Sequence, residues 1–239
     1  MVIRPAIAAL SRPSETSCFS LHTEKSTNPS DFVQPGDWII ANLSSYCDLI
    51  WYWTIYSGVV MIISDFDGGG LEACPNRFKA FWHYFLHDST CSNSSSKPTV
   101  PTVSEYPIII FPEGVSSNGR GVLKFIANLS FARRNQRIHL TCTKFQSITF
   151  NPAFPGQPNS FFLHFWKLCC QLENNLNTRT ILPAALFSSN FDLPLAGENP
   201  QIFNRTLQQI VAALGHLRPL NLDANDKISF IKSFKFGKE

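Results

Sequence analysis

The chain has 239 residues, which is enough for one domain with a substantial hydrophobic core. Charged residues make up only 15% of it, and a net charge of +3 without a basic stripe does not favour a nucleic-acid-binding protein. Its seven cysteines include no Cys-x-x-Cys pair and no His/Cys grouping at zinc spacing, which favours reduced thiols over a disulfide framework or a metal site.

The chain begins with a segment that lacks any packing pattern. Residues 1–36 are rich in Ser, Thr and Pro without a sustained period, so they are expected to form a loosely ordered arm. We interpret residues 37–239 as one domain. Within it, the polar, Pro-punctuated residues 89–104 are expected to be a loop insertion rather than a boundary.

A short apolar strand, a polar turn and an apolar helix follow the arm. Residues 38–42 predict the strand and residues 49–56 the helix, with the turn ending at Asp48. Ligands of parallel α/β sheets bind at the carboxyl ends of the strands. The turn between Asn42 and Asp48 is therefore one candidate part of a site.

A second strand leads into a similar turn. Three consecutive isoleucines in residues 108–111 are typical of a strand covered on both faces, as in parallel sheets. Glu113 follows, and glycines at 114, 119 and 121 predict tight turning before a helix over residues 122–132. This turn offers a second set of candidate site residues, namely Glu113, Gly114, Ser117, Asn118, Arg120 and Lys124.

The remaining elements complete a single α/β domain. Further strands are predicted at residues 59–63, 138–145 and 178–183, the last an edge strand because it ends in proline. Further helices are predicted over residues 160–170, from Asn199-Pro200 to a stop at Gly215, and after a cap at Asn225. We therefore expect a mixed, mainly parallel sheet flanked by helices.

Two features suggest a membrane surface. The segment 160–170 is apolar nearly all the way round, and its Trp166-Lys167 pair suits an interfacial position as well as a buried one. The end of the chain is basic, with Lys227, Lys232, Lys235 and Lys238. No apolar run reaches the roughly 18–20 residues of a transmembrane helix, so the expected membrane contact is peripheral.

The second turn carries a family resemblance. Phe111-Pro-Glu-Gly114, then Ser117-Asn-Gly-Arg-Gly121 and Leu123-Lys-Phe125, resembles without gaps the motif of the glycerophospholipid acyltransferases, which include the lysophosphatidate acyltransferases. The form of the strand at residues 138–145 resembles the fungal oleoyl-CoA-type branch of that family. The resemblance implies a glycerol-3-phosphate acyltransferase-like fold.

The resemblance also implies an activity and roles for residues. The implied reaction moves a fatty acyl group from acyl-CoA to the free hydroxyl of a lysophospholipid, above all lysophosphatidate, with no other cofactor and no metal. Glu113 and Gly114 would hold the glycerol of the acceptor. Ser117, Arg120 and Lys124 would meet its phosphate, with Asn118 in the same substrate-binding segment. A cytosol-facing, peripheral location on the endoplasmic reticulum or a lipid droplet would follow.

The first turn departs from the family at one position. The family's catalytic motif reads Asn-His-x-Ser-x-x-Asp, and Asn42 and Asp48 match it in register, but the histidine position holds Leu43. In the family the histidine is the general base and the aspartate orients its ring. Leucine cannot accept a proton, and loss of a positioned base costs roughly 10²–10⁴-fold in rate. His83 or His87, from a helix-like segment, is a conceivable substitute.

Leu43 therefore leaves an alternative open. A catalytically silent relative would bind lysophospholipid or acyl-CoA as a carrier or as a regulatory partner of an enzyme. A structural or trafficking factor is disfavoured, because it needs none of Glu113, Ser117 and Arg120. Cys47 is a weak candidate nucleophile because the adjacent Asp48 raises the pKa of its thiol. The sequence indicates no oligomeric state.

Overall fold

The structure is a computed structural model that describes residues 33–56, 60–64, 71–74, 105–126, 129, 137–146, 161–170, 175–183, 186 and 199–236. Most of the predicted arm and all of the predicted loop at residues 89–104 lie outside these residues, as do His83 and His87.

The described strands form a mixed sheet that is parallel at its centre. Its order is β3-β2-β4-β1-β6-β7. The strand β1 pairs in parallel with β4 and β6, and β4 pairs in parallel with β2, whereas the edge strands β3 and β7 are antiparallel to their neighbours. The bounds are Trp38–Ala41 for β1, Val60–Ser64 for β2, Leu71–Cys74 for β3, Ile108–Phe111 for β4, Ile138–Gln146 for β6 and Asn175–Ile181 for β7. The predicted α/β sheet and the edge position of the strand before Pro183 are confirmed.

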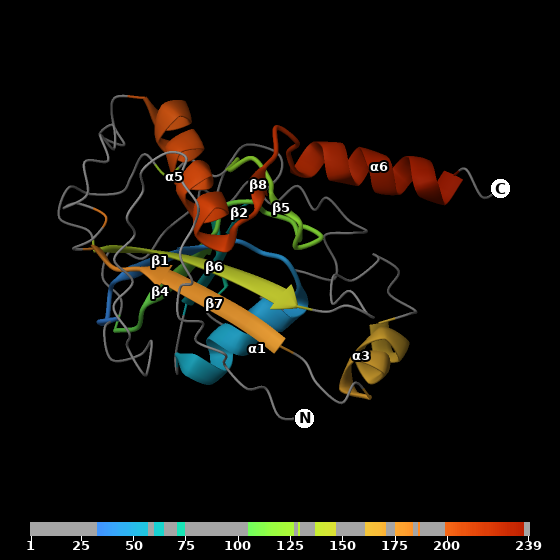
Figure 1. Cartoon of the computed structure of the whole chain (residues 1–239), viewed down its shortest axis with the longest axis horizontal. Coiled ribbons are helices and arrows are strands. Elements are labelled where there is room, and N and C mark those ends of the chain that lie inside the picture. The colour runs from blue at the N-terminus through green and yellow to red at the C-terminus, as the bar shows by residue number, and fades with distance from the viewer. Residues whose placement is uncertain are drawn as a thin grey trace, which may run out of the picture.

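Helices cover both faces of this sheet. Figure 1 shows α1 (Tyr46–Ile55) on one side of β1 and β6, and α5 (Pro200–Gly215) on the other. Alternate residues of the central strands face the two helices. Ile39, Ala41, Ile109 and Phe111 pack on the α1 side, and Ile40, Ile108, Ile110 and Leu140 pack on the α5 side. This double burial explains why β1 and β4 lack polar residues.

The helix α1 begins three residues before the predicted start. Ser45 is its N-cap and accepts a hydrogen bond from the Cys47 amide at 3.1 Å, while Asp48 accepts one from the Ser45 amide at 2.9 Å. This reciprocal capping box places Asp48 in the first turn of the helix rather than in the preceding loop.

The predicted helix over residues 122–132 is wrong at its start. Gly121–Val122 forms β5, which pairs in parallel with β8 (Arg218–Pro219), and Leu220 then donates to the Val122 carbonyl at 2.9 Å. Residues 123–126 are not helical, since their backbone follows the C-terminal segment instead. A Cβ at Gly121 would lie 2.8 Å from the Leu220 side chain, so this close approach needs glycine.

Asn199 caps α5 and the helix ends at Gly215, both as predicted, but the left-handed residue at its C-terminus is His216, with φ at 49°, rather than the glycine. Gly215 lies in the last helical turn, where a Cβ would overlap the Cys142 sulfur. The last helix, α6 (Ala224–Phe236), is capped by Asp223 rather than Asn225, because Asp223 Oδ1 accepts from the amide of residue 225 at 2.9 Å.

The predicted aromatic helix is confirmed as α3 (Phe161–Cys169), but its environment is one-sided. His164 and Leu168 are buried, while Leu163 and Trp166 are 57% and 68% exposed. None of the described helices is both long and apolar enough to cross a membrane.

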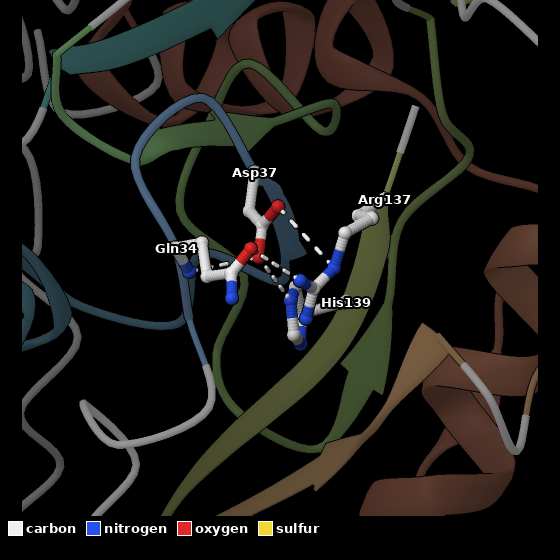
Figure 2. A network of polar contacts seen from close by, with 4 residues as sticks. All are labelled: Gln34, Asp37, Arg137 and His139. Atoms are coloured by element: carbon white, nitrogen blue, oxygen red, sulfur yellow. Dashed lines mark hydrogen bonds and ion pairs between the residues drawn. The ribbon is translucent and has the colours of Figure 1, made fainter. Parts of the chain in front are cut away.

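A partly buried network of polar contacts connects the amino ends of β1 and β6 (Figure 2). Asp37 Oδ2 lies 3.0 Å from His139 Nε2, and Asp37 Oδ1 lies 3.5 Å from Arg137 Nε. Burial lowers the pKa of His139, and the Asp37 carboxylate opposes this shift. This network lies at the amino edge of the sheet, whereas the two turns predicted to form the site follow the carboxyl ends of β1 and β4.

Candidate functional site

The two sequence-predicted turns follow adjacent parallel strands. β1 ends at Ala41 and β4 at Phe111, and their pairing brings both carboxyl ends to one edge of the sheet. The Ser117 amide donates to the Leu43 carbonyl at 2.7 Å, which joins the two turns directly. A Cβ at Gly119 would lie 3.7 Å from that of Ser44, so the contact extends along both segments.

Asp48 is buried and holds its own turn together. Its Oδ2 accepts hydrogen bonds from the Ser44 amide at 2.7 Å, the Ser44 hydroxyl at 2.8 Å and the Ser45 amide at 2.9 Å. Burial raises the pKa of Asp48 to about 6, although these groups and the Thr143 side chain pull it down. Its Oδ1 has no hydrogen-bond partner of regular geometry within the part of the chain that the structure describes.

Asn42 has a positioning contact with β6. Its side-chain amide donates to the Thr143 carbonyl at 3.0 Å, and its Oδ1 accepts from the Thr143 amide at 2.7 Å. These two bonds continue the β1–β6 ladder one residue beyond Ala41. Asn42 therefore fixes the start of the Asp48 turn.

Leu43 belongs to the core. Its side chain is 1% exposed and packs in the α1-side cluster with Leu49, Tyr52 and Phe111. The position where the resemblance places a base is thus filled by a buried hydrocarbon.

Glu113 lies in the second turn, near enough to Asp48 for the charges of the two carboxyl groups to interact. It follows β4 in a turn made possible by Gly114, whose φ of 71° suits glycine. Burial raises the pKa of Glu113 well above its usual range; the backbone of Leu123 and Leu43 opposes the shift, and the Asp48 charge adds to it. Neither carboxyl oxygen has a hydrogen-bond partner of regular geometry among the described residues.

The rest of the second turn divides into a buried and an exposed part. Ser117 is buried, and its hydroxyl accepts from the Gly119 amide at 3.3 Å. Asn118, Arg120 and Lys124 are exposed, and Asn118 Oδ1 accepts from the Arg120 amide at 3.0 Å. The second turn therefore combines two exposed cations, Arg120 and Lys124, with a buried carboxyl group, Glu113.

Two residues at this edge carry no signal in the sequence. His164, from α3, places its Nδ1 3.1 Å from the hydroxyl oxygen of Tyr46, the first residue of α1. Lys227, from α6, donates to Ser116 in the second turn. Both contacts join residues more than 100 positions apart, which no local spacing reveals. Within the described residues, no group of three His, Cys, Asp or Glu side chains is placed to hold a metal ion.

Fold and site define an α/β protein with a polar site at the carboxyl edge, built from the turns after β1 and β4. The chain is 24% identical over 227 residues, covering 90% of itself and 69% of the relative, to a Schizosaccharomyces pombe protein named "Putative lysophosphatidic acid:oleoyl-CoA acyltransferase". No family model matches the chain, and no solved structure matches it. The similarity supports an acyltransferase and does not favour a silent carrier.

Proposed function

We propose that the protein transfers a fatty acyl group from acyl-CoA to the free hydroxyl of a lysophospholipid, with lysophosphatidate as the acceptor. The observation that carries this proposal is the junction of the Asp48 and Glu113 turns, bonded through Ser117 and Leu43. The similarity to the yeast protein, which extends over nearly the whole chain, supports the same activity.

The proposed chemistry has a simple balance. The acceptor oxygen attacks the thioester carbonyl carbon, a C–O bond forms, the C–S bond breaks, and the hydroxyl proton ends on the sulfur of CoA. Arg120 and Lys124 are the exposed cations that would bind the acceptor phosphate, the arginine through its fork of N–H donors. Asp48, buried at the start of α1, would orient or polarise whatever base serves the site rather than take the proton itself.

Turnover by the natural protein is expected to be slow. The buried Leu43 supplies no base, so the reaction relies on the reactivity of the thioester and on positioning of the two substrates.

The Glu113→Ala variant tests this function. We expect its turnover of lysophosphatidate with oleoyl-CoA to be at least about 100-fold slower than that of wild type. A loss of this size is typical when one positioned group is removed from an active site. The matched control is Glu105→Ala, an exposed glutamate before β4 whose removal should change nothing. Absence of turnover in the wild-type protein, or equal turnover in Glu113→Ala, would contradict the proposal.

We also propose that α3 makes the peripheral membrane contact that a lipid acceptor requires. Leu163, Phe165 and Trp166 are exposed on this helix beside the exposed Lys167, a combination suited to an anionic lipid surface. The Tyr46–His164 hydrogen bond attaches α3 to the start of α1, at the edge of the sheet where the site lies. In Figure 1, α3 lies on the side of the molecule toward which β6 points.

Co-sedimentation with phosphatidate-containing vesicles checks this contact. The double variant Leu163→Ala/Trp166→Ala should bind about tenfold more weakly, because it loses apolar area that would enter the interface. Ile202→Ala, which removes an exposed apolar side chain from α5, serves as the control and should bind like wild type. Equal binding by the double variant would exclude α3 as the contact.

A further inference from the structure

The C-terminal helix reaches the second turn of the site through one side chain. Lys227 Nζ donates to the Ser116 carbonyl at 2.6 Å and to the Ser116 hydroxyl at 2.9 Å, and the lysine is half-buried. Burial raises the pKa of Glu113, and the positive charge of Lys227 is the smallest of the interactions that oppose this rise. Lys227 was predicted only as part of a basic tail for lipid, but its ammonium group points into the protein.

The segment before Lys227 runs along the same turn. After the β5–β8 pairing, the Lys124 amide donates to the Leu222 carbonyl at 2.9 Å, and Asp223 then caps α6. Gln208, from α5, donates to the carbonyls of both Val122 and Leu220, at 3.1 and 2.8 Å. In Figure 1 the remainder of α6 extends away from the sheet, so its first turn is the part that meets the site.

Lys227 is thus connected to both turns of the site through successive hydrogen bonds. It holds Ser116; the next residue, Ser117, donates to the Leu43 carbonyl; and the Leu43 turn contains Asp48. Hydrogen bonds from a charged donor are stronger than neutral ones, so this contact is a firm constraint on the turn. Without the ammonium group, the Ser116 carbonyl would lose a donor and Glu113 a nearby positive charge.

We infer that Lys227 is a positioning residue for the acceptor. It fixes residues 114–124 so that Arg120 and Lys124 are presented in one geometry to the acceptor phosphate. This inference rests on the proposed function for the identity of the acceptor. It predicts that loss of Lys227 weakens lysophosphatidate binding while acyl-CoA binding is unchanged.

Steady-state kinetics of Lys227→Met test the inference. We expect the KM for lysophosphatidate to rise about tenfold with the KM for oleoyl-CoA unchanged, and Lys227→Arg to restore part of the loss. Arg205→Met, the loss of an exposed cation on α5, is the matched control and should behave like wild type. An equal rise in both KM values, or none, would overturn the assignment.

Hydrogen exchange gives a second readout that needs no activity. Amides of residues 114–124 should exchange about tenfold faster in Lys227→Met, with those of α1 unchanged. Unchanged exchange at 114–124 refutes the positioning role, whereas faster exchange without wild-type turnover refutes only the proposed function. If Lys227→Met does not fold, the same exchange measurement is made on Ser116→Ala, which removes one acceptor of the ammonium group. Amides of residues 114–124 should again exchange faster than in wild type.

Discussion

Replacing Leu43 by histidine is expected to raise the rate of acyl transfer by roughly 10²–10⁴-fold, the contribution of a positioned general base. The substitution restores the histidine five positions before Asp48, and Asp48 Oδ1 lacks a hydrogen-bond partner of regular geometry among the described residues. We expect that oxygen to accept a hydrogen bond from an imidazole N–H at position 43. The measurement is turnover of lysophosphatidate and oleoyl-CoA by the purified variant beside wild type.

The double variant Leu43→His/Asp48→Asn is the control for this mechanism. It should lose most of the gain, since the ring would no longer be oriented by a carboxylate. The histidine should also lower the free energy of unfolding by about 1–3 kcal/mol, because Leu43 lies in a packed apolar cluster. If the folded Leu43→His variant turns over no faster than wild type, the departure from the family at Leu43 does not limit the reaction.

The second large effect is a dependence of stability on pH that comes from Asp48. Its pKa is raised from 3.8 to about 6 in the folded protein, so between these values the folded state binds more protons than the unfolded state. The free energy of unfolding should therefore fall as pH rises from about 4 to about 6. At roughly 1.4 kcal/mol per pKa unit, the fall is about 3 kcal/mol.

Urea denaturation of wild type and Asp48→Asn across this range isolates the effect. The difference in unfolding free energy between the two proteins should move in favour of Asp48→Asn by about 3 kcal/mol as pH rises, and then level off. His139, whose pKa is lowered, acts in the opposite direction but is common to both proteins and cancels. A pH-independent difference would mean that the Asp48 carboxyl group ionises as easily in the folded state as in the unfolded one.

Glu113→Gln extends the same test. The pKa of Glu113 is also raised by burial, so replacing its carboxyl group by an amide that does not ionise should likewise favour the folded state at neutral pH. Because the Asp48 charge contributes to that shift, the two substitutions are not expected to be additive.

The sequence signals for the two site strands were strong because both faces of each strand are buried. Residues 108–111 and 38–41 contain no polar side chain, and that pattern needs a sheet covered by helices on both sides. The start of α1 had a readable signal as well. Ser45 and Asp48 stand at the spacing of a capping box, which places the helix start before Asp48.

The sequence by itself determined that Asp48 and Glu113 each follow a buried strand, and hence that both lie at the carboxyl edge of a parallel sheet. Only the tertiary structure decided that the two strands are neighbours, that Leu43 points into the core, and that Val122 pairs with the C-terminal segment instead of starting a helix. The hydrogen bond between Lys227 and Ser116, which are 111 residues apart in the chain, is likewise visible only in the tertiary structure. Strand burial and capping are local properties that leave a pattern in neighbouring residues, whereas these contacts arise from packing of distant segments, which no local period encodes.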